Sequence, residues 1–159
     1  MDEQYNRVNV LPRSNTFLIY VIGCPGSGKG TLCKLLAQYY RCHHISVGDL
    51  LRGLQNEQSF AIKDYMQEGE LLRKPDLVLY FCCGKEIALH RYLTRKLEGR
   101  LDDNEEIFCR RYEEFERLNP AIVDYYRDLG ILLVIETSGE TSVSFRNLVA
   151  MIKSNGKWM

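Results

Sequence analysis

A glycine-rich loop between an apolar run and a helical pattern constrains this chain more than any other feature. Residues 23–31 read Gly-Cys-Pro-Gly-Ser-Gly-Lys-Gly-Thr, which is GxxxxGK followed by a glycine and then a threonine. The run from Thr16 to Ile22 before the loop is typical of a buried parallel strand. Lys29 to Tyr40 after the loop carries apolar residues at helical spacing. Strand, glycine loop and helix in this order predict a phosphate-binding loop.

The residues of this loop have separate expected tasks. Glycines at 26 and 28 let backbone N–H groups turn towards phosphate oxygens, and the helix adds the positive end of its dipole. Lys29 can reach a transferred phosphoryl group, and the hydroxyl of Thr31 suits a position near Mg²⁺. We therefore expect ATP and Mg²⁺ as cofactors. The expected ATP-binding set in this segment is Gly23, Pro25, Gly26, Ser27, Gly28, Lys29, Gly30 and Thr31.

Strand-like and helix-like segments alternate along the rest of the chain. Three further strands are expected at His44–Ser46, Leu77–Cys83 and Ile131–Ile135. Helices are expected at 48–54, 59–67, 84–95, 105–118, 120–128 and 142–152, and Pro120 suits the start of a separate helix. The alternation predicts an α/β protein with three layers around a parallel sheet of about four strands. Residues 1–15 read as a polar leader, and 16–159 as one domain.

The composition limits the classes of binding partner that we expect. The 21 basic and 21 acidic residues leave no net charge, which argues against a nucleic acid polymer as partner. The apolar runs are too short to cross a membrane, and no secretory signal is evident. The six cysteines form no CxxC pair and are expected to be free thiols. We expect a monomer that acts on small-molecule nucleotides. Its expected location is the cytoplasm, with the nucleus left open as a second location.

The loop form GxPGxGKGT resembles that of adenylate kinases and, more closely, of the short-lid uridylate-cytidylate kinases. His44 to Arg52, which reads His-Ile-Ser-Val-Gly-Asp-Leu-Leu-Arg, resembles the second signature of this family, and Gly69 to Leu72 resembles its segment beside the acceptor base. The likeness extends over roughly Phe17 to Ile152. It implies the fold of the P-loop nucleoside monophosphate kinases, with residues 46–75 as the acceptor-binding part. The implied acceptor-binding residues in this part are Ser46, Gly48, Arg52 and Leu72.

A third resemblance lies in an arginine-rich segment. Arg91, Arg95, Gly99 to Glu105 and Arg111 are similar to the short lid of the family, here residues 96–106. Phosphoryl transfer spreads negative charge over several oxygens, so converging cations stabilise it. The resemblance implies that the catalytic charges are Lys29, Arg95, Arg100 and Arg111. It also implies that Arg91 and Arg95 contact ATP, and that Arg100 and Arg111 contact the acceptor. Asp102 and Asp103 are implied to orient the arginines.

One segment of the family pattern is missing. The family has an internal strand ending in D-G-[FY]-P-R, followed by a helix, whose aspartate helps to hold Mg²⁺ and whose arginine contacts the acceptor phosphate. Here Pro75 to Val78 resembles the start of the helix before that segment, and Val78 to Cys83 resembles the strand after it. We therefore expect one strand fewer than the family, an open acceptor site, and a junction between Val78 and Leu79. Glu136 is the first candidate for a substitute metal-binding acid.

The function expected from these features is transfer of the ATP γ-phosphoryl group to UMP, CMP or AMP. The Asp-Asp-Asn of the lid, Cys33 and residues 123–126 favour pyrimidine acceptors. One alternative is a catalytically impaired nucleotide-binding remnant, or a truncated splice or gene-model product of such a kinase. A second is another P-loop kinase of small metabolites. A regulatory GTPase fits less well, because the chain has neither NKxD nor DxxG. Sequence leaves the acceptor base and the oligomeric state open.

Overall fold

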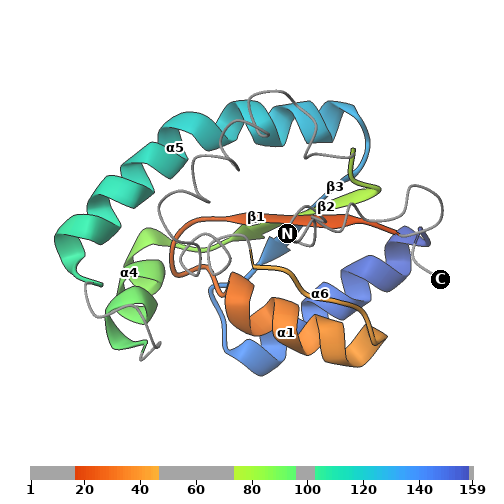
Figure 1. Cartoon of the computed structure of the whole chain (residues 1–159), viewed down its shortest axis with the longest axis horizontal. Coiled ribbons are helices and arrows are strands. Elements are labelled where there is room, and N and C mark those ends of the chain that lie inside the picture. The colour runs from red at the N-terminus through yellow and green to blue at the C-terminus, as the bar shows by residue number, and fades with distance from the viewer. Residues whose placement is uncertain (1–16, 47–73, 96–102, 158–159) are drawn as a thin grey trace, which may run out of the picture.

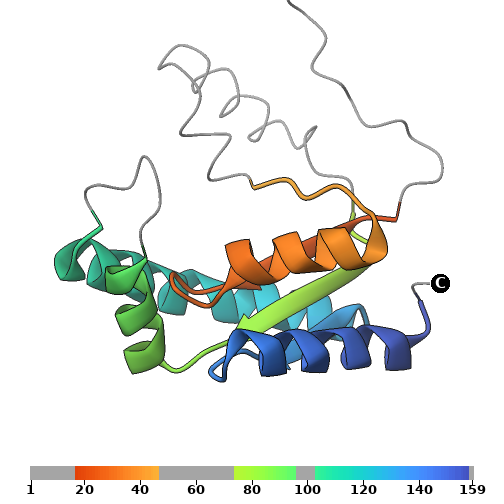
Figure 2. The ribbon, with the colours of Figure 1, turned by 90° about the horizontal axis from the view of Figure 1, so that it is seen from below.

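The computed structural model describes residues 17–46, 74–95 and 103–157, which form three layers (Figure 1). Three parallel strands make the sheet of this described part, in the order β1 (Ile19–Gly23), β2 (Leu77–Cys82) and β3 (Leu132–Glu136). Helices α1 (Lys29–Tyr40) and α6 (Thr141–Asn155) lie side by side on one face, and α5 (Glu105–Asp128) crosses the other (Figure 2). Helix α4 (Lys85–Thr94) lies beside the glycine loop. The expected three-layer α/β fold is confirmed.

The central strand β2 explains why its sequence shows no polar alternation. Leu77, Leu79 and Phe81 pack into a core with residues of α1, β3 and α6. On the opposite face Val78 is fully buried, and the ring of Tyr80 stacks on Phe115 of α5 at 6.5 Å between centroids. A parallel strand covered by helices on both faces buries both sets of side chains, so it reads as one apolar run.

The junction between β1 and β2 differs from the expectation. Leu18 N donates a hydrogen bond of 2.7 Å to the Asp76 carboxylate, and Asp76 N donates one of 2.9 Å to Leu18 O. Pro75 and Asp76 are not helical, and Val78 and Leu79 are consecutive strand residues paired with Tyr20 and Val21. The resemblance of Pro75 to Val78 to the start of a helix is therefore not matched by the structure, because Leu77 and Val78 belong to β2, which continues through Leu79 and is buried on both faces.

The prediction of a strand at His44–Ser46 is also wrong, since these residues have no strand conformation. A strand needs a hydrogen-bonded neighbour, and within the described part of the chain β1 pairs on one side only, with β2. Ile45 is 57% exposed, as expected for a segment that does not pack into the sheet.

The two helices predicted at 105–118 and 120–128 are a single helix, α5, with Pro120 inside it. Its buried residues Phe108, Tyr112, Asn119 and Val123 follow helical spacing through the proline, so one face packs without a break. Pro120 removes the N–H that would bond to the carbonyl of Glu116. Both residues are exposed, so water can satisfy that carbonyl. Packing on both sides of Pro120 outweighs its local cost.

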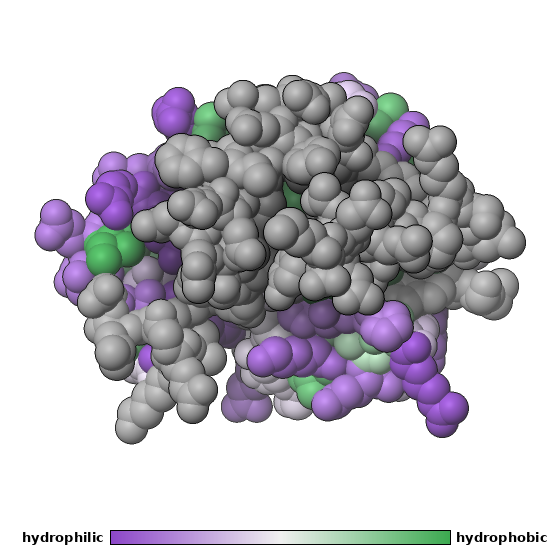
Figure 3. All heavy atoms as spheres, in the orientation of Figure 1, coloured by the Kyte–Doolittle hydropathy of each residue, from purple (hydrophilic) through white to green (hydrophobic). Residues whose placement is uncertain are grey.

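The surface visible in Figure 3 is mostly hydrophilic where the described residues lie, with only small separate hydrophobic patches. Among the helices that the structure describes, none is long and apolar enough to cross a membrane. All six cysteines are free thiols, as expected.

Candidate active site

The glycine loop turns tightly between β1 and α1, as expected. Gly26 and Gly28 have φ angles of +79° and +90°, a conformation that costs little only for glycine. A Cβ on Gly26 would lie 2.1 Å from the carbonyl oxygen of Ala88 in α4, which is closer than atoms can approach. The loop therefore packs directly against the α4 backbone. A side chain at Gly26 would push the loop and the α4 backbone apart.

Lys29 lies at the centre of this loop. Its ammonium group donates to Gly23 O at 2.5 Å and Cys24 O at 2.8 Å, and lies 3.4 Å from Ser27 Oγ. Burial lowers the pKa of Lys29 to about 8, and the nearby Arg111 adds to the effect because two cations repel. Burial raises the pKa of the Cys24 thiol to about 11, so Cys24 is a neutral packing residue at neutral pH.

The first turn of α1 suits an anion. Gly28 is its N-cap and offers no side-chain hydrogen bond, and no acidic residue lies in the first turn. Backbone N–H groups at this end of a helix lack helical partners and carry partial positive charge. Gly30 and Thr31 are exposed here, so the hydroxyl of Thr31 is accessible.

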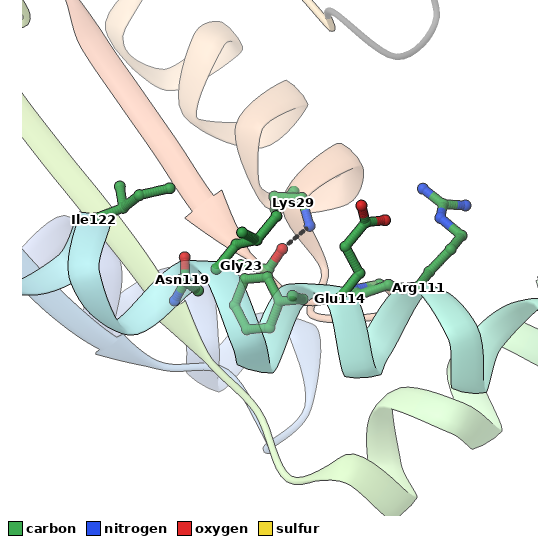
Figure 4. A pocket seen from close by; sticks show the side chains of 9 residues that line it. Gly23, Lys29, Arg111, Glu114, Asn119 and Ile122 are labelled. Carbon is green, nitrogen blue, oxygen red and sulfur yellow. Dashed lines mark hydrogen bonds between the residues drawn. The ribbon is translucent and has the colours of Figure 1, made fainter.

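A cavity of about 360 Å³ opens between the loop and α5 (Figure 4). The loop contributes Gly23, Pro25 and Lys29, and α5 contributes Arg111, Glu114, Phe115, Leu118, Asn119 and Ile122. The cavity therefore brings Lys29 together with Arg111, which lies 82 residues later in the sequence and was expected at the same site. The lining combines two cations and the carboxylate of Glu114 with apolar side chains, a mixture that can accommodate a phosphorylated organic ligand.

The other arginines lie nearby but differ in their contacts. Arg95 Nε donates to Asp103 at 2.7 Å, so Asp103 contacts one of the arginines that it was expected to orient. Arg91 instead donates at 2.7 Å each to the carbonyl oxygens of Thr137 and Gly139. Arg91 therefore fixes the loop after β3, and two of its nitrogens are already engaged.

Three residues at this site were not found by sequence reasoning. Glu114 lies one turn after Arg111 on α5 and points into the cavity. Asn119 is buried and lines the same cavity. Thr137 is 1% exposed, and its hydroxyl lies 2.9 Å from Ser27 O and 3.1 Å from Cys82 O. Helical spacing from Arg111 could have indicated Glu114, but no sequence pattern marks Thr137.

Some expected site residues fall outside the described part of the chain: Gly48, Arg52, Leu72, Arg100 and Asp102. Ser46 is described and half-buried, in an irregular segment. Glu136, the first candidate for a metal-binding acid, accepts a hydrogen bond of 2.7 Å from Ser138 N, and the bonds from Ser138 lower its pKa. It does not line the cavity, whereas Glu114 does.

Comparison with known proteins agrees with this arrangement. Residues 22–75 match a family model described as an AAA domain. UMP-CMP kinase 2 of Oryza sativa subsp. japonica is 32% identical over 167 residues, which cover 77% of this chain and 68% of that protein. The chain belongs to the nucleoside monophosphate kinase family.

Two other members of the family show how the lengths compare. Probable UMP-CMP kinase 2 of Arabidopsis thaliana is 28% identical over 195 residues, covering 95% of this chain and 75% of that protein. Adenylate kinase isoenzyme 1 of Gallus gallus is 26% identical over 181 residues, covering 85% of this chain and 93% of that protein. Both alignments are longer than the 159 residues of this chain, so they open gaps in it.

Proposed function

We propose that this chain transfers the γ-phosphoryl group of ATP to a nucleoside monophosphate, with UMP and CMP preferred over AMP. The observation that carries the proposal is the cavity that Lys29 of the phosphate loop and Arg111 of α5 both line. In this reaction the bond between the γ-phosphorus and its bridging oxygen breaks, and a bond to an acceptor phosphate oxygen forms. ADP and a nucleoside diphosphate are the products.

The protein groups act mainly by position and charge. The loop amides and Lys29 hold the β- and γ-phosphates, while Arg111 faces the transferred group from α5. Arg95, held by Asp103, is the second arginine proposed for this charge. The acceptor residues Ser46, Gly48, Arg52, Leu72 and Arg100 remain proposals that come from the family resemblance.

The residues fit Mg²⁺ that arrives with the nucleotide. Mg²⁺ in such sites takes most of its ligands from phosphate and water, so one protein hydroxyl is a sufficient contribution. The exposed hydroxyl of Thr31 at the start of α1 is that group. In the described part of the chain no cluster of three His, Cys, Asp or Glu could hold a metal without the nucleotide. When bound, Mg²⁺ neutralises charge on the phosphates.

Turnover is proposed to be slow compared with intact members of the family. Among the described residues β1 has no neighbour on its second side, and the alignments open gaps in this chain. Exposed apolar residues at helical spacing on α5 and its C-cap, Leu118, Ile122, Tyr125 and Leu129, are further support, since a buried strand beside β1 would need such a cover. Loss of an internal strand and helix explains these three observations together.

The test is a coupled assay of ADP formation by the purified chain with ATP, Mg²⁺ and UMP, CMP or AMP. Turnover with UMP and CMP above that with AMP is expected, and Lys29→Met is the inactive control. Binding of ATP is measured in parallel by calorimetry. ATP binding without turnover on any acceptor would favour the nucleotide-binding remnant, and absence of ATP binding would contradict the assignment of the loop.

A further inference from the structure

Tyr92 of α4 lies between the two arginines that the proposed function uses. Its side chain is fully buried, yet the guanidinium carbon of Arg95 lies 4.0 Å from its ring centroid. The guanidinium carbon of Arg111 lies 5.9 Å from the same centroid, and Arg111 Nη1 donates to the Tyr92 hydroxyl at 3.4 Å. One aromatic residue therefore contacts two cations, one at the C-cap of α4 and one on α5.

This arrangement answers a physical problem of the site. Two guanidinium groups that must face one phosphoryl group repel each other when no phosphate lies between them. The negative face of an aromatic ring attracts a cation, and a phenolic oxygen accepts a hydrogen bond from one. Tyr92 offers both, and Asp103 adds a carboxylate that pairs with Arg95. The pair is thus held without its anionic ligand.

The position of the ring is fixed by a second core cluster. Tyr92 packs edge-on to Phe108 at 5.3 Å between centroids, and Phe108 stacks on Tyr112 at 5.4 Å. Cys24 of the phosphate loop and Ala88 of α4 belong to the same cluster. The ring therefore stands in a rigid relation to the loop as well as to both arginines.

One guanidinium nitrogen of Arg95, Nη2, can donate a hydrogen bond to a ligand. Its Nε is engaged by Asp103, but its Nη2 is buried and has no hydrogen-bond partner within the described part of the chain. A buried charged donor without a partner is costly, and a phosphate oxygen would satisfy it.

We propose that Tyr92 is a positioning residue that holds Arg95 and Arg111 at the spacing a transferred phosphoryl group requires. The proposal rests on the proposed kinase function. Tyr92 does not contact the nucleotide and acts through the two arginines: through its hydroxyl on Arg111 and through its ring on both.

The test compares Tyr92→Phe, which removes the hydroxyl alone, with Tyr92→Leu, which removes the ring as well. We expect Tyr92→Phe to lower kcat about tenfold, with the ATP dissociation constant unchanged, because a hydrogen bond to a charged group is lost. Tyr92→Leu should lower kcat by roughly a further tenfold. Tyr112→Phe is the matched control, since Tyr112 belongs to the same cluster and its ring faces the ammonium group of Lys85; its kcat should equal that of the parent.

A double-mutant cycle separates positioning from mere packing. In an Arg111→Ala background Tyr92→Phe should have no further effect on kcat, because its partner is absent. Additive losses, or a kcat of Tyr92→Phe equal to that of the parent, would overturn the proposal.

A measurement without turnover keeps the proposal independent of the kinase function. In ¹⁵N-arginine NMR spectra, the side-chain signal of Arg111 should shift in Tyr92→Phe, and that of Arg95 only in Tyr92→Leu. These shifts with an inactive parent would support the positioning role while the kinase function fails. Unchanged arginine signals in both variants would overturn the role of Tyr92, whatever the parent's activity.

Discussion

The hydroxyl of Thr137, at the end of β3, lies 2.9 Å from the carbonyl oxygen of Ser27 in the phosphate loop, 110 residues away in the sequence. The same hydroxyl lies 3.1 Å from Cys82 O at the end of β2. Its single proton is shared between the two acceptors, and Thr137 N also donates to Cys82 O at 2.8 Å. One side chain thereby ties the loop to the carboxyl ends of two strands, where parallel sheets bind their ligands.

Thr137→Val should destabilise the protein and weaken ATP binding. It removes the hydroxyl at nearly constant volume and takes a donor from the buried carbonyl of Ser27, whereas Cys82 O keeps its bond from Thr137 N; we expect a cost of about 1–3 kcal/mol. Thr137→Ser keeps the hydroxyl and should cost about 1 kcal/mol for the lost methyl group. Urea denaturation and ATP calorimetry are the measurements, with the exposed Thr94→Val as control. A Thr137→Val variant as stable as the parent would show that the tie contributes nothing.

ATP binding should take up a proton above pH 8. Burial lowers the pKa of Lys29 to about 8, whereas a neighbouring phosphate raises the pKa of a lysine. At pH 8.5 the free lysine is mostly neutral and must be protonated on binding, so affinity falls as pH rises through 8. Calorimetry in two buffers of different ionisation enthalpy should give uptake near zero at pH 7 and most of a proton at pH 8.5. Equal uptake by Lys29→Arg, which stays charged, would refute this account.

Arg111→Ala should lower kcat by roughly a hundredfold or more, with an almost unchanged dissociation constant for ATP. The charge lines the cavity opposite Lys29 and is expected to matter most when the phosphoryl group is in transfer. Arg110→Ala is the matched control, because its side chain is exposed on the same helix and does not line the cavity. Equal losses in ATP binding and kcat for Arg111→Ala would indicate a structural role instead.

Insertion of a strand-and-helix segment from a relative immediately before Pro75 should raise soluble yield and turnover together. The new strand would pair with the second side of β1 and shield the apolar face of α5. The same segment placed between Val78 and Leu79 should abolish cooperative unfolding, because it divides the central strand. Circular dichroism and the coupled assay distinguish the two. Unchanged turnover after insertion before Pro75 would show that the shortened sheet does not limit the reaction.

Local patterns of apolar residues in the sequence predicted those strands and helices whose packing follows the same patterns. The apolar run before the glycine loop, the spacing in Lys29–Tyr40 and the run at Leu77–Cys83 correspond closely to β1, α1 and β2. The loop could be predicted because its glycines and lysine have few other uses in that order. Arg111 and Lys29 were expected at one site, and the cavity brings them together.

Other features depend on tertiary structure and have no local signal. Pro120 reads as a helix start, yet burial of Asn119 and Val123 on one face carries α5 through it. His44–Ser46 has strand-like residues, yet these residues do not adopt a strand conformation. The roles of Thr137 and Tyr92 arise from contacts across many residues of sequence, which spacing rules along a single helix or strand do not reach.

The hydrogen bonds between Lys29 and the loop affect how the site discriminates between ATP and the monophosphate. Three oxygen atoms of the loop surround its ammonium group, so a phosphate gains the lysine only by exchange with them. A lone phosphate replaces these partners poorly, because few of its oxygens can reach loop amides at once. A triphosphate engages several amides in the same event and offsets the exchange. The loop is therefore expected to bind a nucleoside triphosphate more tightly than a monophosphate. The monophosphate acceptor then does not occupy the site where ATP, the phosphoryl donor, must bind.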